Sequence, residues 1–264
     1  MKNINRYFPF QPEIQANTDS YVELKPTGQS IDKDIALFYQ FKTTNDPSYF
    51  SLVPDGCFDI LFCCDSNHPS AFLWTSPFQR RKQPNFINNC EYFGVRFFPE
   101  QGMIKLNYPM EELLEQQIPL FDVLSGNPSI IEEIAAGESF SNRVAIFKKF
   151  LYKTRCEMGY DYQIIDYAIR KIYLSNGGLN ISDLSEETGY SDRYIRKIFE
   201  KYIGFSPKQF CQIVKFQNSL DMILKTESSL LDSSYYDQSH FIREFKKFTL
   251  LTPKQYKEMY KSAL

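Results

Sequence analysis

The strongest constraint on the fold is an internal repeat in the C-terminal part of the 264-residue chain. The segment FSPKQF at residues 205–210 returns as LTPKQY at residues 251–256, a shift of 46 residues. At the same shift Phe199 aligns with Phe245. A repeat of this kind indicates that one small helical unit occurs twice, because such a unit cannot bury its apolar face alone.

The first unit has the signature of a helix-turn-helix. Gly189 lies where a short helix that begins at Ile181 must end in a left-handed conformation, and Ser191 can cap the next helix. That next helix carries apolar residues at spacings of three and four, so its basic residues are expected to face outward. The apolar positions are Ile195, Ile198, Phe199 and Tyr202, and the basic ones are Arg193, Arg196 and Lys197. A helix fits the DNA major groove, and arginine can donate two hydrogen bonds to guanine there.

The second unit repeats this arrangement. Asp237 can cap its second helix, whose apolar face is Phe241, Phe245 and Phe248. The opposite face carries candidate base contacts at Gln238, Ser239 and Arg243, and candidate phosphate contacts at Lys246 and Lys247. Taken singly, each basic residue is better explained as part of a solvated helix face. The repeat favours DNA, because a connecting helix over residues 207–224 would place two such helices about one turn of DNA apart.

Residues 162–260 resemble the DNA-binding domain of the AraC/XylS family of bacterial transcription regulators. The resemblance rests on GYSDRYIRKIFEKYIGFSPKQF at residues 189–210 and on YYDQSHFIREFKKFTLLTPKQY at residues 235–256. It implies a monomeric module of seven helices with two helix-turn-helix units. It also implies recognition helices near residues 191–202 and 238–248, which bind a promoter and alter transcription.

The chain departs from the family at two places. Ser234 stands where family members have glycine, and the chain is a few residues shorter than they are between Leu224 and Tyr235. A non-glycine residue in a left-handed conformation is strained, so the second unit is expected to grip DNA more weakly or in an altered pose. Near Lys197 the family has arginine, and lysine loses bidentate recognition.

The first half has a different periodicity. From residue 21 to residue 98, short runs of aromatic and β-branched residues alternate with turn formers, which predicts an antiparallel barrel or sandwich. In the last run Phe93, Val95 and Phe97 share one face, and Arg96 lies on the other. Helices that close this domain are expected at residues 111–115, 129–136 and 142–156.

The first half also resembles the sensor half of some AraC/XylS regulators, through LVPDGCFDILF at residues 52–62 and FGVRFFP at residues 93–99. This resemblance implies a cupin-like barrel. An aromatic lining with one buried charge would suit an amphipathic or anionic effector, so Arg96, Asp59 and Phe98 are candidate effector-binding residues. In the alternative interpretation, Arg96 is simply paired with a carboxylate such as Asp59. Asp55 and Gly56 are interpreted first as a turn and second as a pocket rim.

Composition excludes several classes of function. The formal net charge of −2 argues against a surface that is positive throughout, so basic residues matter only where they cluster. No apolar run approaches the length of a membrane span, and residues 1–10 lack a secretion signal, so a cytoplasmic protein is expected. The six cysteines contain no CxxC pair, which predicts reduced, mostly buried thiols.

No enzyme chemistry stands out in the sequence. A metal-dependent cupin needs several imidazoles, but the chain has only His68 and His240, so neither a metal nor another cofactor is expected. There is no nucleophile with a nearby histidine partner, no glycine-rich phosphate loop and no distinctive carboxylate pair.

Together these patterns predict an α+β chain with two domains. Residues 1–157 form a cupin-like antiparallel β-barrel with closing helices, and residues 158–264 form an all-α double helix-turn-helix domain. The expected function is sequence-specific transcription regulation, controlled by a small-molecule effector or by dimerisation of the first domain. Candidate partners are double-stranded promoter DNA, RNA polymerase, a small-molecule effector and a second copy of the chain. Binding to a membrane is not expected. The alternative is a protein-interaction module derived from such a regulator, whose shortened second unit no longer binds DNA.

Overall fold

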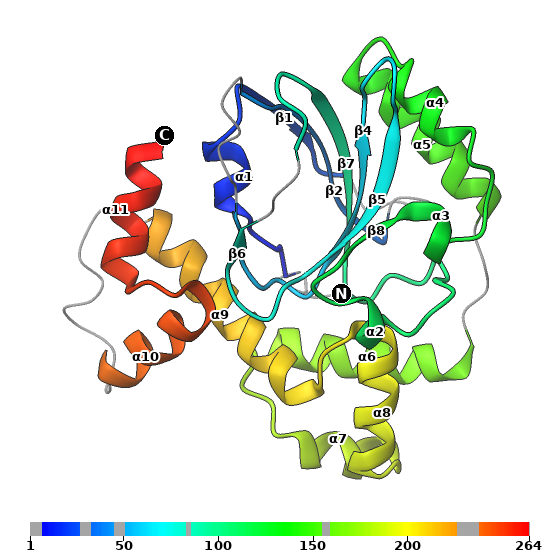
Figure 1. Ribbon diagram of the computed structural model, residues 1–264. Helices are drawn as coiled ribbons and strands as arrows, with labels where there is room; N and C mark the ends of the chain where they lie inside the picture. The colour runs from blue at the N-terminus through cyan, green and yellow to red at the C-terminus, as the bar shows by residue number, and fades with distance from the viewer. Residues whose placement is uncertain are drawn as a thin grey trace.

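A computed structural model describes residues 7–26, 33–44, 51–82, 86–154, 159–225 and 238–263. Its first half is built on an antiparallel sheet and its second half is helical, as Figure 1 shows. This confirms the predicted α+β class. Within the described ranges, no helix combines the length and the apolar character needed to span a bilayer.

Six strands form one antiparallel sheet in the order β1-β2-β7-β4-β5-β8. Their bounds are β1 Ser20–Leu24, β2 Ile35–Lys42, β4 Phe58–Cys63, β5 Ser70–Thr75, β7 Glu91–Phe97 and β8 Gln117–Pro119. Two further strands, β3 (Ser51–Leu52) and β6 (Arg81–Lys82), pair separately. No pairing joins β1 to β8 within the described residues, so the sheet is open and a cupin-like barrel describes it only approximately.

The alternation expected in the last run of the first half is present in β7. Phe93, Val95 and Phe97 are buried in the core on one face of the sheet. There they meet Phe147 of α5 (Phe140–Thr154), with ring centroids 6.3 to 6.5 Å from those of Phe93 and Phe97. Arg96 points to the opposite face, beside α1 (Pro12–Ala16) and β3. The short helices α2 (Met110–Leu113), α3 (Leu120–Val123) and α4 (Ile130–Ala135) complete this half.

The second half consists of six helices within the described residues. They are α6 (Tyr160–Leu174), α7 (Ile181–Thr188), α8 (Asp192–Ile203), α9 (Pro207–Lys225), α10 (Gln238–Thr249) and α11 (Pro253–Ala263). Figure 1 shows α9 running between the α7–α8 pair at one end and the α10–α11 pair at the other. Residues 155–158, which include the predicted boundary between the two domains, lie outside the described ranges, and α6 begins at Tyr160.

The repeated motif is a capping box that starts α9 and α11. Gln209 Oε1 accepts hydrogen bonds from the backbone N–H of Ser206 at 2.8 Å and from its hydroxyl at 2.7 Å. Gln255 accepts from the N–H and hydroxyl of Thr252 at 2.9 Å each. The glutamine thereby satisfies an N–H at the helix terminus, and proline is suited to the first helical position because its missing N–H would be unpaired there. The repeated sequence motif therefore corresponds to the same helix start in both units.

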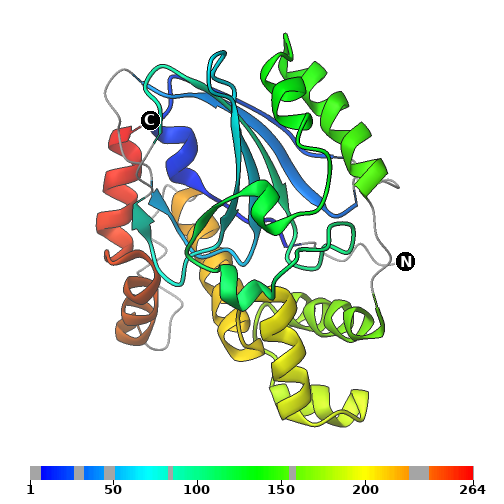
Figure 2. The same cartoon turned by 45° about the vertical axis from the view of Figure 1, so that its right-hand side comes forward.

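The two halves share one apolar core. Tyr7 stacks on Tyr173 of α6 with ring centroids 5.0 Å apart, and Phe78 meets the ring of Phe205 edge-on at 5.2 Å. At Gly204, where φ is 85°, a Cβ atom would lie 2.8 Å from the Leu114 side chain, so a larger residue would be strained and would displace Leu114 at the contact between the halves. Figure 2 shows the sheet half resting on the helices of the second half.

A buried carboxylate also ties the first half to α11. Glu13 of α1 accepts hydrogen bonds from Arg80 Nε at 2.7 Å and Arg80 Nη2 at 2.8 Å. The Tyr256 hydroxyl of α11 donates to the same carboxylate at 3.1 Å. The Arg80 backbone N–H donates to the Phe248 carbonyl at the end of α10, at 2.6 Å. The Glu13 cluster, defined here as Glu13, Arg80 and Tyr256, thus fixes the second helical pair against the sheet half.

Candidate nucleic-acid interface

The first helix-turn-helix is built as the sequence predicts. Gly189 ends α7 with φ of 72°, a left-handed conformation that glycine adopts without steric cost. Ser191 then caps α8, and its hydroxyl accepts the Tyr194 N–H at 3.3 Å. Ile195, Ile198 and Phe199 of α8 are buried with Leu184 of α7 as expected, whereas Tyr202 is only half-buried.

The basic residues of α8 are all exposed. They are Arg193, Arg196, Lys197 and Lys201, of which the sequence singled out the first three. Arg196 Nε lies 2.8 Å from Glu200 Oε1, in an ion pair whose arginine side chain is 68% exposed. An exposed pair of this kind contributes little free energy, so Arg196 can exchange Glu200 for an acceptor on a ligand at small cost.

The start of α8 is held against α6. The Tyr194 hydroxyl donates to Asp161 Oδ1 at 2.7 Å, and this hydrogen bond raises the pKa of Tyr194 to about 12. The ring of Tyr194 also stacks on Tyr190, with centroids 5.0 Å apart. These contacts fix the N-terminal half of α8, which is the part that carries Arg193 and Arg196.

The second unit presents a similar face on α10. Phe245 and Phe248 are buried, and Phe248 stacks on Phe216 of α9 at 4.8 Å. Ser239, Arg243, Lys246 and Lys247 are exposed. Arg243 Nε donates to the Ser239 carbonyl at 3.2 Å, and Lys247 Nζ lies 3.5 Å from Gln212 Oε1.

Three predictions about the second unit fall outside what the structure describes. The Asp237 cap and the strained Ser234 lie in residues 226–237, and the side chain of Gln238 is likewise outside the described part. The roles of these three residues therefore remain predictions from the sequence.

The spacing of the two basic helices is set by α9. This helix has 19 residues, so it is roughly 28 Å long at about 1.5 Å per residue. Both α8 and α10 pack against it, near its opposite ends (Figure 1). Successive major grooves on one side of B-DNA lie about 34 Å apart, a separation close to that length.

Two further exposed lysines were missed by the sequence analysis. Lys208 and Lys254 occupy the same position of the repeat, in the first turns of α9 and α11. Backbone N–H groups at helix N-termini favour phosphate, and a lysine in the first turn adds a positive charge. The repeat itself was the signal, because it aligns these two residues with each other.

In the first half, Arg96 forms a buried ion pair. Its side chain is buried and donates to Asp59 through Nε and Nη2, both at 2.8 Å, while Nη1 lies 3.9 Å from Asp55. The Tyr39 hydroxyl donates to the same Asp59 carboxylate at 2.7 Å. The alternative interpretation of Arg96, pairing with Asp59, is therefore the one found.

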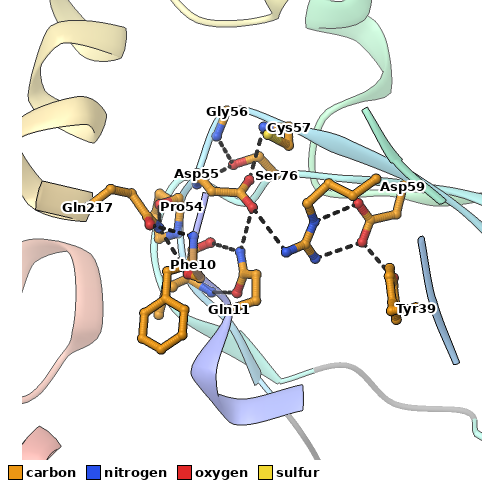
Figure 3. Close-up of polar contacts among 12 residues, drawn as sticks. Phe10, Gln11, Tyr39, Pro54, Asp55, Gly56, Cys57, Asp59, Ser76 and Gln217 are labelled. Carbon is orange, nitrogen blue, oxygen red and sulfur yellow. Dashed lines mark hydrogen bonds and ion pairs between the residues drawn. The ribbon is translucent and has the colours of Figure 1, made fainter. Parts of the chain in front are cut away.

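A series of buried and partly buried hydrogen bonds leads from this pair to α9 (Figure 3). Asp55 accepts from Gln11 Nε2 at 2.9 Å, and burial raises the pKa of the Asp55 carboxyl while the charge of Arg96 opposes the rise. Gln217 of α9 donates to the Pro54 carbonyl at 2.7 Å and accepts the Phe10 N–H at 2.9 Å. Segment 7–16 thus contacts both the polar network and the helical half.

A cavity of about 190 Å³ adjoins this network. Its walls come from segment 8–15, β1, β2 and Asp221 of α9, and Arg96 is the one predicted effector residue that lines it. Asp59 lies behind Arg96, and Phe98 is buried against Phe8 with ring centroids 5.9 Å apart.

In comparisons with known proteins, the helical half and the sheet half match different families. Residues 184–259 match a family described as a helix-turn-helix domain, and residues 23–119 match one described as a domain of unknown function, DUF6597. An uncharacterized HTH-type transcriptional regulator of Haemophilus influenzae and another, SAS0078, of Staphylococcus aureus are each 29% identical over 83 residues, which is 30% of this chain. The aligned part covers only 28% of the first relative and 11% of the second.

Among solved structures, ToxT from Vibrio cholerae aligns over 86% of this chain and 98% of its own, with 11% identity and a TM-score of 0.45. An apo point variant of ToxT from the same organism aligns over 92% of this chain and 99% of its own, with 11% identity and a TM-score of 0.42.

Proposed function

We propose that this chain is a sequence-specific DNA-binding transcription regulator. The match of residues 184–259 to a helix-turn-helix domain of the AraC type supports this. The observation that carries the proposal is the exposure of basic residues on α8 and α10, two helices that pack near the ends of one connecting helix. Arg193, Arg196 and Arg243 read bases in this proposal. Gln238 and Ser239 are further candidate base contacts, Lys197 is a weaker one because lysine lacks bidentate recognition, and Lys246 and Lys247 contact phosphates.

The same proposal assigns the sheet half to sensing or dimerisation. Residues 1–157 and 158–264 are the two domains, and the chain acts in the cytoplasm, where RNA polymerase is a candidate partner. The cavity beside Arg96 supports a small effector. Because Asp59 and Asp55 already compensate the guanidinium charge, we expect an uncharged polar ligand there, in place of the anionic one predicted from Arg96 alone.

Replacing Arg196 with alanine is expected to weaken binding to the cognate promoter by about 1–3 kcal/mol and to relax sequence preference, because the arginine faces the groove. The promoter is first found by footprinting the bound chain across the genome, and affinities for matched and mismatched sites are then measured by gel shift. Arg170→Ala is the control, because Arg170 is an exposed arginine with an i,i+4 partner on α6. Unchanged preference in the Arg196 variant would refute the assignment of α8 as a reading helix.

Replacing Lys247 with alanine is expected to weaken binding to all sequences alike and to reduce the slope of log K against log salt by about 1, because one phosphate contact is lost. Affinities measured from low to high salt test this, with Lys149→Ala, at an exposed position of α5, as control. If the second unit does not grip DNA, as in the protein-interaction alternative, the Lys247 variant will show the parental slope.

A further inference from the structure

One edge of the six-stranded sheet is formed by β1. This strand pairs with β2 along one side, and within the described residues no strand pairs with its other side. Along an edge strand, the N–H and C=O groups of alternate residues point away from the sheet and can pair with a further strand. Four of the five residues of β1 are exposed. In the described part of the chain, this edge is therefore available to a partner that adds a strand.

The two faces of β1 differ in character. Tyr21, Glu23 and Lys25 line the cavity beside Arg96, so the odd-numbered residues share that face. Val22 and Leu24 lie on the opposite face, and both are exposed although they are apolar. A partner strand must therefore offer polar side chains on the first face and apolar ones on the second.

A second copy of β1 meets this requirement. A twofold axis perpendicular to the sheet makes the two strands antiparallel and keeps each residue on its own face. Pairing centred on Val22 sets Asp19 opposite Lys25 of the second copy and Tyr21 opposite Glu23 of the second copy. Each of these contacts occurs twice because of the symmetry. The charges of the strand are therefore complementary to themselves.

The neighbouring symmetric registers lack this complementarity. Centring the pair on Tyr21 sets Asp19 opposite Glu23, and centring it on Glu23 sets that carboxylate opposite its own copy. Like charges directly opposite each other are destabilising. Centring the pair on Leu24 brings in Pro26, which has no N–H to donate. Charged residues on an edge strand oppose indiscriminate pairing, and here they select one register.

The present contacts of these side chains are easily exchanged. Lys25 Nζ lies 3.5 Å from Glu23 Oε1, and the two side chains are 59% and 41% exposed. The Tyr21 hydroxyl donates to Glu23 Oε2 at 3.0 Å. Exposed ion pairs contribute little free energy, so Lys25 can exchange Glu23 for Asp19 of a second copy at small cost.

We propose that β1 joins two copies of this chain into a dimer, through an antiparallel pair of strands centred on Val22. A single pair of five-residue strands buries less than the roughly 1,200 Å² of a standard interface, so we expect weak association with a Kd on the order of 10 µM. The proposal gives a surface and a partner to the dimerisation assigned above to the sheet half. Only its effect on promoter binding rests on the proposed DNA-binding function.

The test follows association of the full chain without DNA by sedimentation velocity, from about 1 to about 200 µM. The parent should dimerise. Asp19→Lys and Lys25→Asp each set like charges opposite each other twice, so each variant alone should dimerise at least about tenfold more weakly. An equimolar mixture of the two variants should form a heterodimer with about the affinity of the parent, because each introduced charge then meets its opposite. This recovery also shows that both variants are folded.

Glu132→Lys and Lys149→Asp are the matched controls, because they make the same charge changes at exposed positions of α4 and α5. Both should dimerise as the parent does. A parent that stays monomeric at about 200 µM, single variants that dimerise normally, or a mixture no tighter than its components would overturn the β1 dimer. Weaker association of Lys149→Asp would place the contact on α5 and overturn it as well.

The effect on DNA is measured separately with the promoter found by footprinting. The parent should bind it more tightly than Asp19→Lys does, and the mixture of the two variants should regain the parental affinity, because a dimer presents two reading modules together. Equal affinities overturn this effect alone. A chain that dimerises through β1 but binds no DNA contradicts the proposed function and leaves the dimer intact.

Discussion

Replacing Arg96 with methionine is expected to lower the free energy of unfolding by about 3–5 kcal/mol, the usual cost of leaving a buried charge without its partner. Arg96 is 3% exposed and Asp59 is 4% exposed, so water cannot take the place of the guanidinium. Methionine has a comparable volume but donates no hydrogen bond, and Asp59 would lose two bonds of 2.8 Å. Urea unfolding followed by circular dichroism measures the change.

The double variant Arg96→Met, Asp59→Leu separates the charge from the packing. Replacing both members of a buried ion pair with apolar residues is often neutral or stabilising, so most of the lost stability should return. A deficit of about 1–2 kcal/mol should remain, because the Tyr39 hydroxyl loses its acceptor and buried Asp55 loses the cation 3.9 Å away. If the single variant unfolds at the parental urea concentration, Arg96 is not the buried, paired cation described above.

The elements that the sequence predicted correctly are those fixed by local interactions. The turn at Gly189 needs only a residue that tolerates positive φ, and the Ser191 cap needs only a hydroxyl before a helix. The alternation along β7 follows from the geometry of a single strand. The helix expected over residues 207–224 is found as α9, with its end displaced by one residue.

The role of Arg96 could not be decided in the same way, because it depends on which strands are neighbours. Asp59 faces Arg96 only because β4 pairs with β7 in the register that sets these two residues opposite each other. A contact across 37 positions of sequence is not encoded in either strand alone. The alternation of β7 shows that Arg96 lies on the face opposite the apolar one, but it does not show which residue Arg96 contacts on that face.

The contacts between the halves are further still from any local pattern. Gln217 and Phe10 are 207 positions apart, and no periodicity relates them.

Replacing Glu13 with alanine is expected to lower the free energy of unfolding by about 2–4 kcal/mol and to loosen α11 more than the sheet. The change removes the acceptor of Arg80 and Tyr256, and Tyr256 is fully buried. The effect is smaller than that at Arg96 because the Arg80 side chain is 18% exposed and can recover water. Glu132→Ala, at an exposed position of α4, should change stability by no more than about 0.5 kcal/mol.

Hydrogen exchange distinguishes a general loss of stability from a local one. The Glu13 cluster joins Tyr256 of α11 to the sheet half, and Arg80 also holds the end of α10 through the Phe248 carbonyl. Faster exchange should therefore appear first in α10 and α11, while α8, which packs on α2 and α6, keeps its protection. On DNA, the Glu13 variant should lose contacts of the second unit and retain those of the first. Uniformly faster exchange across both pairs of helices would contradict a local role for Glu13.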